Sequence, residues 1–346
     1  MNFASDNGGA VHPAIMAAMV TANEGAVASY GDDPLTRAAE DRLREVFDAP
    51  GLRMFLTTTG TSANAISCAA LCPPWGRIFC HEDAHIETSE AGAPEMFTAG
   101  AKLTLIPGEG GRIAPDALDR AARHWAGQGL HSGQNAMVSI TNATEWGRIY
   151  RPDEVAEIAE VARRHGLGLH MDGARFANAV AATGAHPADL SHRAGVDILV
   201  FGGTKNGAMG VEAVLVFDAA RAETVEFMRK RSGHLLSKHR YLAAQMLAMV
   251  EDGLWLDMAG HANRMAAELA QAVAALDDVR LIQPAETNQL FLDMPAEYAA
   301  RARAAGAVFY DWPMPEAVEG RVALRLVTSW ASSRDDIAAL IRAMAA

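Results

Sequence analysis

Short apolar runs alternate with helix-like segments through the first two thirds of the chain, and this alternation constrains the fold most. Between the apolar runs lie helical segments such as 115–126 and 152–166, both of which begin with Pro-Asp. Strands are predicted over residues 53–59, 77–80, 102–107, 136–141, 167–172, 197–203 and 213–217. Continuous apolar strands separated by helices predict an α/β fold with a mostly parallel, seven-stranded sheet covered on both faces.

The pattern changes after about residue 218. Residues 219–231 and 239–276 predict long helices rich in Ala, Met and Leu. They are followed by a strand-like segment, a helix, a second strand-like segment and a closing helix, at 288–294, 295–306, 322–329 and from about 333. On a length of roughly 150 residues per domain, we expect a large domain over 1–250 and a smaller α+β domain over 251–346.

Charge and cysteine content disfavour several classes of protein. The 346 residues include 42 acidic and 30 basic ones, a formal net charge of -12, without the basic face that nucleic-acid recognition requires. The N-terminus lacks a targeting pattern, and no apolar stretch approaches the roughly 20 residues of a membrane span. Three cysteines, Cys68, Cys72 and Cys80, disfavour a disulfide framework. We therefore expect a reduced, cytoplasmic protein.

The segment 59–64, Thr-Gly-Thr-Ser-Ala-Asn, stands between a predicted strand and a predicted helix. Gly60 permits a tight turn there, and the backbone N–H groups of Thr61 and Ser62 would open the helix. Free N–H groups and the helix dipole form a seat for phosphate. The alternative is an ordinary Ser/Thr helix cap without a ligand.

Asp172 ends a predicted buried strand, and Arg175 follows three residues later. A buried carboxylate is costly unless it is paired with a proton or a cation. Opposite a pyridine nitrogen, Asp172 would keep that nitrogen protonated. Arg175 would reach a phosphate or a carboxylate. The alternative is a capping aspartate with a solvated arginine.

Lys205 lies in Gly-Gly-Thr-Lys-Asn-Gly, directly after the predicted buried strand 197–203. A desolvated lysine loses its proton near neutral pH and becomes a nucleophile toward an aldehyde. The neighbouring Thr204 offers a further phosphate contact, whereas a lysine in a surface turn is the alternative. Each motif is weak alone, but together the three provide the anchors that pyridoxal 5'-phosphate (PLP) requires.

In these motifs the chain resembles the L-threonine aldolase family of fold-type I PLP-dependent enzymes, in its low-specificity bacterial subgroup. The matching stretches keep the family's order along nearly the whole chain: residues 5–6, 29–36, 59–64, 85–92, 169–180, 202–207 and 325–330. The resemblance implies a PLP-dependent transferase-like fold. It also implies cleavage of L-threonine, L-allo-threonine and related β-hydroxy-α-amino acids such as phenylserine to glycine and an aldehyde.

The resemblance implies a role for each matching residue. Lys205 would carry PLP as a Schiff base, Asp172 would pair with the pyridine nitrogen, and His85 would stack on the ring. Phosphate contacts are implied for Gly60, Thr61 and Thr204. Contacts with the substrate carboxylate are implied for Arg175 and Arg325, with Ser5 nearby. Tyr30 would line the site of a neighbouring subunit, which implies a homotetramer built as a dimer of dimers, with the active site at the dimer interface.

One departure from the family pattern concerns the catalytic base. Many members carry a histidine in an Asn-Thr-His-Asn stretch, but the corresponding residues 140–147 contain none. The group that removes the β-hydroxyl proton is therefore open between His85, a water held by Glu90, and Glu145.

Two other functions fit parts of the sequence. A PLP-dependent β-eliminating lyase or an aminotransferase would share the same anchors. A metal-dependent hydrolase would instead use the cluster of His81, Asp83 and His85, because histidine and carboxylate ligands at such spacing can bind a cation. We expect no metal, since the PLP set already accounts for His85.

Overall fold

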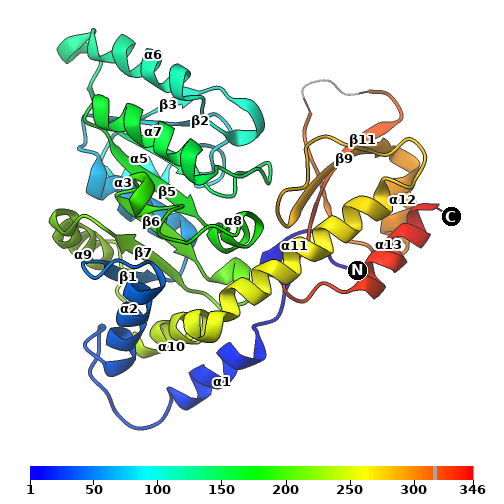
Figure 1. The fold of residues 1–346 in the computed structure, drawn as a ribbon, viewed down its shortest axis with the longest axis horizontal. Coiled ribbons are helices and arrows are strands. Elements are labelled where there is room, and N and C mark those ends of the chain that lie inside the picture. Colours follow the sequence, from blue (N-terminus) through cyan, green and yellow to red (C-terminus); the bar gives the residue numbers. More distant parts are fainter. Residues whose placement is uncertain (315–317, 346) are drawn as a thin grey trace.

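A seven-stranded sheet forms the centre of the larger domain in the computed structural model, which describes residues 1–314 and 318–345 (Figure 1). The strand order is β1-β7-β6-β5-β4-β2-β3. The strands are β1 (Arg53–Thr57), β2 (Gly76–His81), β3 (Lys102–Ile106), β4 (Gln134–Thr141), β5 (Gly168–Gly173), β6 (Ile198–Gly202) and β7 (Glu212–Val216). The pairings of β7 with β1 and β6 are antiparallel, and all other pairings in this sheet are parallel. The predicted mostly parallel sheet is confirmed.

Helices cover both faces of this sheet. Successive side chains along each strand point to opposite sides, so apolar strands present an apolar surface on each face that a helix layer must cover. Along β6, Leu199 and Phe201 face one apolar cluster, whereas Ile198 and Val200 face the other. The helices are α1 (Pro13–Thr21), α2 (Pro34–Val46), α3 (Gly60–Leu71), α4 (His85–Thr88), α5 (Ala93–Phe97), α6 (Pro115–Ala126), α7 (Pro152–Arg164), α8 (Phe176–Thr183), α9 (Ala222–Arg231) and α10 (Arg240–Val250). Helices α2, α6, α7, α8 and α10 contribute to the first cluster, and α3 and α9 contribute to the second. None of the described helices is both long and apolar enough to cross a membrane.

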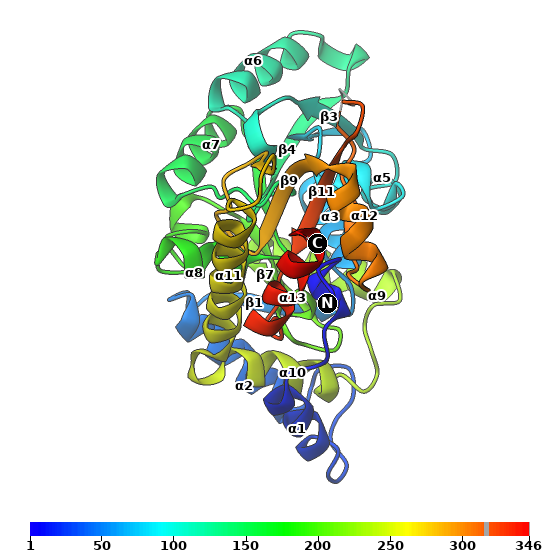
Figure 2. The same cartoon turned by 90° about the vertical axis from the view of Figure 1, so that its right-hand side faces the viewer.

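A four-stranded antiparallel sheet forms the smaller domain, with the order β10-β11-β9-β8. Its elements are α11 (Leu254–Val273), β8 (Arg280–Leu281), β9 (Gln289–Pro295), α12 (Ala296–Ala304), β10 (Tyr310–Asp311), β11 (Arg321–Val327) and α13 (Arg334–Ala345). Helices α12 and α13 lie over β9 and β11 in Figure 2, where Leu292 and Leu324 pack into a third apolar cluster. The predicted smaller α+β unit is confirmed.

The prediction of a single helix over 239–276 is wrong. The chain forms α10 and α11, separated by the turn Glu251–Gly253. Asp252 and Gly253 have φ angles of 50° and 76° there, and a right-handed helix cannot continue through left-handed backbone. The turn lets α11 join both domains: Met258 packs into the larger core and Leu269 into the smaller one.

The first residues of the chain lie with the smaller domain. The Phe3 N–H donates to the Val308 carbonyl (2.8 Å), and the Phe3 carbonyl accepts from the Val327 N–H (2.8 Å). The Phe3 side chain is buried in the cluster of the smaller domain. The chain then crosses to the larger domain at Asp6. This N-terminal arm, residues 1–6, therefore connects the two domains, and the boundary near residue 250 stays a prediction.

The strands β5 and β6 end in close backbone contact. A Cβ on Gly202 would lie 2.6 Å from the Ala174 carbonyl oxygen and 2.8 Å from its Cα. Because backbone atoms cannot swing away as a side chain can, any residue larger than glycine would push the segment after β5 away from the segment after β6.

We expect Gly202→Ala to lower the free energy of unfolding by roughly 1–3 kcal/mol, the usual cost of overpacking. Denaturant titration measures this change. Gly51→Ala is the matched control, since an added Cβ meets nothing within 4 Å there, and it should change stability by less than about 0.5 kcal/mol. Equal stability of the two variants would contradict the close packing.

Candidate active site

Residues from distant parts of the sequence meet at the carboxyl edge of the larger sheet. Parallel strands end at the same edge, so the segments that follow β1, β2, β4, β5 and β6 converge there. They enclose a cavity lined by Gly60, Asn64, His85, Thr141, Ala143, Glu145, Asp172, Ala174, Arg175 and Lys205. Five of the residues predicted from sequence are thus brought together: Gly60, His85, Asp172, Arg175 and Lys205.

Helix α3 presents its N-terminus at this cavity. Thr59 caps the helix, and its Oγ1 accepts from the Ser62 N–H (3.2 Å). The helix cannot pair the N–H groups of Gly60 and Thr61 internally. A Cβ on Gly60 would meet nothing within 4 Å, so there is space beside these donors. The capping interpretation is confirmed, and the phosphate seat stays a prediction that this geometry permits.

Asp172 is buried near the end of β5, with both carboxylate oxygens hydrogen-bonded. Oδ2 accepts from Asn64 Nδ2 (2.9 Å), and Oδ1 accepts from the Ala174 N–H (3.0 Å). Burial acts to raise the pKa of Asp172, but the charges of His85 and Lys205 outweigh it and hold the pKa below its ordinary value. Asp172 is therefore a buried, ionised carboxylate.

Lys205 lies in the short 3-10 turn Thr204–Asn206 after β6 and is partly buried. Burial lowers the pKa of Lys205, and the positive charge of Arg175 lowers it further. No described residue is hydrogen-bonded to its amine. The cavity thus contains an unpaired amine with a lowered pKa, as an aldehyde-binding lysine requires.

His85 and Asp172 belong to one hydrogen-bond network. Glu90 Oε1 accepts from Asn64 Nδ2 (2.8 Å) and from His85 Nδ1 (2.8 Å). Asn64 therefore bridges Glu90 and Asp172. Asn64 is the last residue of the 59–64 motif, but its sequence position alone indicates no such bridge. The hydrogen bond to Glu90 raises the pKa of His85, although burial opposes this.

Glu145 supports His85 from the other side. Its Oε1 accepts from the His85 backbone N–H (2.8 Å) and from Thr141 Oγ1 (2.9 Å), and burial raises its pKa to about 7. The other oxygen, Oε2, is inaccessible. The Glu90 side chain is 0% exposed, whereas that of His85 is 38% exposed. Glu145 is partly exposed, as His85 is, but its Oε1 accepts two hydrogen bonds and its Oε2 is inaccessible, whereas His85 Nε2 is the ring nitrogen not bonded to Glu90.

Arg175 and Arg325 differ in their surroundings. Arg175 lines the cavity and forms a two-point ion pair with Asp6, at 2.8 and 2.9 Å. The solvated arginine considered as an alternative is therefore wrong. Arg325 comes from β11, and its guanidinium carbon lies 5.5 Å from the Tyr310 ring centre and 5.4 Å from that of Trp312. Arg325 is not among the residues that line the cavity.

Other predicted contacts lie around the cavity rather than in it. Ser5 Oγ accepts from the Asn7 N–H (3.1 Å). Thr204 Oγ1 accepts from the Val211 N–H (3.2 Å). Tyr30 is 49% exposed, with Lys230 Nζ 4.9 Å from its ring centre. The implied contacts of Ser5, Thr61, Thr204, Tyr30 and Arg325 with cofactor or substrate therefore stay predictions.

The cluster proposed for a metal hydrolase is not assembled. His81 Nε2 lies 3.1 Å from the Gly108 carbonyl, and Asp83 accepts from Trp146 Nε1. The ligand-type atoms that do gather within 4.8 Å of one another, in the part of the chain that the structure describes, belong to His85, Glu90 and Asp172. That group is the network already described, so the His81–Asp83–His85 interpretation is wrong.

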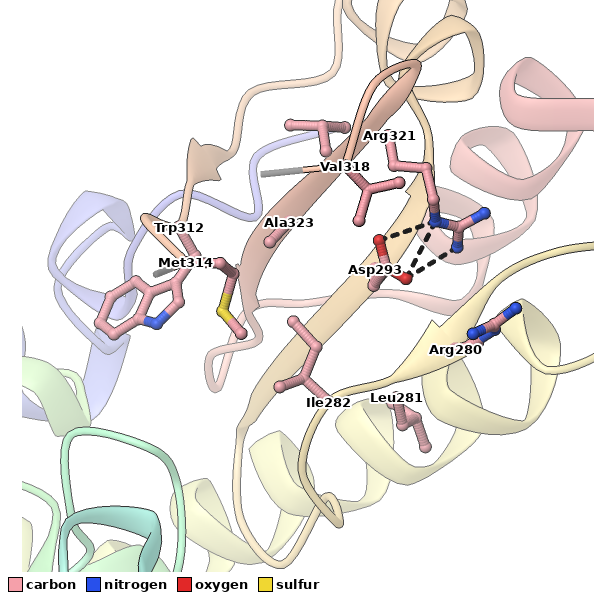
Figure 3. Close-up of a pocket in the computed structure, with 10 residues that line it drawn as sticks. Arg280, Leu281, Ile282, Asp293, Trp312, Met314, Val318, Arg321 and Ala323 are labelled. Atoms are coloured by element: carbon pink, nitrogen blue, oxygen red, sulfur yellow. Dashed lines mark hydrogen bonds and ion pairs between the residues drawn. The ribbon is translucent and has the colours of Figure 1, made fainter. Parts of the chain in front are cut away.

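A larger hollow of about 720 Å³ lies on the smaller sheet, lined by residues of β8, β9 and β11 (Figure 3). Among the described residues that line it, Arg321 and Asp293 form an ion pair at 2.9 Å, and Trp312 lines its other side. The charged groups of this pair satisfy each other. The smaller cavity at Lys205 contains an amine without a hydrogen-bond partner among the described residues, and it is therefore the candidate active site.

The mostly parallel sheet, the smaller antiparallel domain and a lysine facing a buried aspartate together define the fold-type I class of PLP-dependent enzymes. Comparisons with known proteins specify the family. A family model described as beta-eliminating lyase matches residues 2–297. A low specificity L-threonine aldolase of Pseudomonas aeruginosa is 42% identical over 343 residues, 98% of this chain and 96% of that protein. Another, from a Pseudomonas species, is 40% identical over 345 residues, 99% and 97% of the two chains.

A solved structure of Leishmania major threonine aldolase has the same fold, with a TM-score of 0.93 at 28% identity over 99% of this chain and 98% of that one. The chain belongs to the beta-eliminating lyase family, and its full-length relatives there are low specificity L-threonine aldolases.

We expect Glu90→Gln to lower the pKa of His85 measurably. The carboxylate is the main cause of the raised pKa, and a neutral amide stabilises the imidazolium less. Titration of the His85 ring by NMR, identified with a His85→Asn spectrum, measures the change. Glu82→Gln removes a nearby exposed carboxylate and is the control. An unchanged pKa in Glu90→Gln would show that Glu90 does not set it.

Proposed function

We propose that this protein is a PLP-dependent aldolase that cleaves L-threonine, L-allo-threonine and related β-hydroxy-α-amino acids, such as phenylserine, to glycine and an aldehyde. One observation carries the proposal: the unpaired Lys205 amine and the ionised Asp172 carboxylate line one cavity. The Pseudomonas relatives, which match the whole chain and are named low specificity L-threonine aldolases, support the reaction type.

The residues that line the cavity fit PLP in their chemistry. Lys205 would bind the aldehyde carbon, Asp172 would face the pyridine nitrogen, and the N-terminus of α3 at Gly60 and Thr61 would receive the phosphate. When bound, PLP supplies an electron sink for the electron pair of a broken bond to the substrate Cα. The ionised Asp172 strengthens that sink because it favours a protonated ring nitrogen.

His85 is the residue that we assign to proton transfer. Its Nδ1 donates to Glu90, which leaves Nε2 to accept the β-hydroxyl proton. Glu90, to which Asn64 also donates, and Glu145 hold this histidine from two sides. Cleavage of the Cα–Cβ bond then releases the aldehyde, and a proton returned to Cα gives glycine.

The substrate carboxylate would be held by Arg325, with Arg175 and Ser5 alongside. A guanidinium binds a carboxylate through two parallel hydrogen bonds, which fixes orientation as well as position. Orientation decides which bond to Cα is aligned for cleavage. The arginines thereby favour aldol cleavage over transamination or β-elimination at the same cofactor.

We also propose a homotetramer built as a dimer of dimers, in which Tyr30 reaches the neighbouring site, and a cytoplasmic location. Tyr30 is exposed in the single chain and has left-handed backbone with φ 60°, a costly conformation for an aromatic residue. Its N–H donates to the Ser237 carbonyl (3.0 Å), which helps hold that conformation. All three cysteines are buried and free, as suits a reducing compartment.

We expect Lys205→Ala to abolish aldehyde release from threonine, allo-threonine and phenylserine, because no other amine can replace it in the cavity. An assay of aldehyde and glycine with the cofactor-loaded protein measures this. Lys102→Ala, at an exposed strand residue, is the control and should keep full activity. Substantial cleavage by Lys205→Ala would refute the assignment. A keto-acid product from the wild-type protein would identify an aminotransferase instead.

We expect Asp172→Asn to lower kcat on the order of a hundredfold, the effect of losing one preorganised electrostatic contact at a developing charge. Asparagine keeps the size of the side chain but not the charge that protonates the ring. Steady-state kinetics on threonine, with thermal melting as the folding control, measures the loss. A near-normal kcat would show that the carboxylate charge is not needed.

A further inference from the structure

The turn that carries His85 into the cavity is held by two consecutive residues of another segment. This turn connects β2 to α4, and His85 is the first residue of α4. The His85 backbone N–H donates to Glu145 Oε1 (2.8 Å), and Asp83 Oδ2 accepts from Trp146 Nε1 (2.8 Å). The segment after β4 therefore fixes the turn at two points, one through Glu145 and one through Trp146.

The indole N–H of Trp146 is the group that orients Asp83. The Asp83 side chain is 44% exposed, and His81 Nδ1 lies 3.7 Å from its Oδ2. That ring nitrogen accepts from the Asp83 backbone N–H (3.0 Å), so it has no proton to donate to the carboxylate. In the part of the chain that the structure describes, Trp146 is therefore the only hydrogen-bond donor to the Asp83 carboxylate.

The Trp146 ring packs against the smaller domain. Its centre lies 5.0 Å from that of Phe291 and 5.2 Å from that of Trp312, and the last two lie 5.0 Å apart. The three ring planes are inclined to one another by 43°, 76° and 70°, in the tilted and edge-to-face arrangements that aromatic pairs prefer. Phe291 is 1% exposed. These three rings therefore join the smaller domain to the residue that follows Glu145 in the larger one.

We propose that Trp146 is a positioning residue for the reaction, which places the turn of His85 and makes that placement depend on the docked smaller domain. The inference rests on the proposed function, because it concerns the residue assigned there to proton transfer. Trp146 is not among the described residues that line the cavity, so it acts through Asp83 and not on the substrate. Proton transfer needs a hydrogen-bond distance between acceptor and substrate, so a displaced His85 would transfer the proton less efficiently.

The alternative is that Trp146 only fills the space between the two domains. Trp146→Phe separates the two roles, because phenylalanine keeps an aromatic ring but loses the N–H. Asp83→Ala removes the acceptor of the same hydrogen bond, whereas Asp83→Asn removes the charge and keeps an acceptor oxygen. Trp75→Phe is the matched control: Trp75 Nε1 also donates to a side chain, Gln134 Oε1 (3.1 Å), but Trp75 directly precedes β2, at the opposite edge of the sheet.

We expect Trp146→Phe and Asp83→Ala each to lower kcat on threonine on the order of tenfold, less than the roughly hundredfold cost of a 1 Å misplacement. KM should stay near its wild-type value, because the lost placement concerns the transition state rather than binding. The double variant should match either single variant within about twofold, since both changes remove one hydrogen bond. Asp83→Asn and Trp75→Phe should keep most of the wild-type kcat.

A second measurement does not depend on turnover. Hydrogen–deuterium exchange of the cofactor-loaded protein, read by mass spectrometry, reports local opening of the backbone. Exchange over residues 81–88 should be faster in Trp146→Phe and Asp83→Ala than in the wild type, because the turn keeps only its anchor at Glu145. Asp83→Asn and Trp75→Phe should exchange there at the wild-type rate.

Either a wild-type kcat or wild-type exchange over 81–88 in folded Trp146→Phe would overturn the proposal. Losses in kcat that multiply in the double variant would overturn it as well, because two independent effects are not one hydrogen bond. If Trp146→Phe does not fold, Asp83→Ala decides, and equality with Asp83→Asn in kcat and exchange would sink the idea. A wild-type protein that does not cleave threonine would refute the reaction, whereas the exchange rates over 81–88 would still test the placement of the turn.

Discussion

An ionised carboxylate inside a protein is unstable unless donors and cations surround it, and Asp172 is such a group at the end of β5. Its two oxygens accept from Asn64 and from the Ala174 backbone, while the charges of His85 and Lys205 keep it ionised. The same charges act in return on Lys205 and His85. The site is therefore one electrostatic unit, in which each group sets the protonation of the others.

This unit depends on the backbone as much as on the side chains. Strands β5 and β6 end so close together that Gly202 has no room for a Cβ against Ala174. The close approach brings the segments that bear Asp172 and Lys205 to the same edge of the sheet. Around it, Glu90 and Glu145 hold His85 from two sides, so the one accessible histidine of the cavity has a defined ring orientation.

The smaller domain completes the site through the N-terminal arm. Phe3 is buried among residues of that domain, and three residues later Asp6 pairs with Arg175 of the larger domain. One short segment thus connects the two domains and places a carboxylate against Arg175, which lines the cavity. Because the contacts are ionic or charge-assisted and lie in the interior, they are little screened by salt.

Local patterns in the sequence determined the strands, the capped turn before α3, and the positions of Lys205 and Asp172, because each depends on neighbouring residues. A strand is recognisable from its own apolar run, and a reactive lysine from the glycines around it. The break at Asp252 was missed because the apolar pattern of α10 and α11 continues through a turn that only left-handed backbone angles reveal.

Only the tertiary structure decided which polar groups pair. Asn64 and Asp172 are 108 residues apart, and Asp6 and Arg175 are 169 residues apart, so no local spacing indicates either contact. The sequence left the proton acceptor open among His85, a water held by Glu90, and Glu145; the fold buries the Glu90 side chain, engages the carboxylate of Glu145 and leaves one ring nitrogen of His85 not bonded to Glu90. Burial and pairing are properties of the folded surface, and side chains acquire them only when distant segments meet at one edge of the sheet.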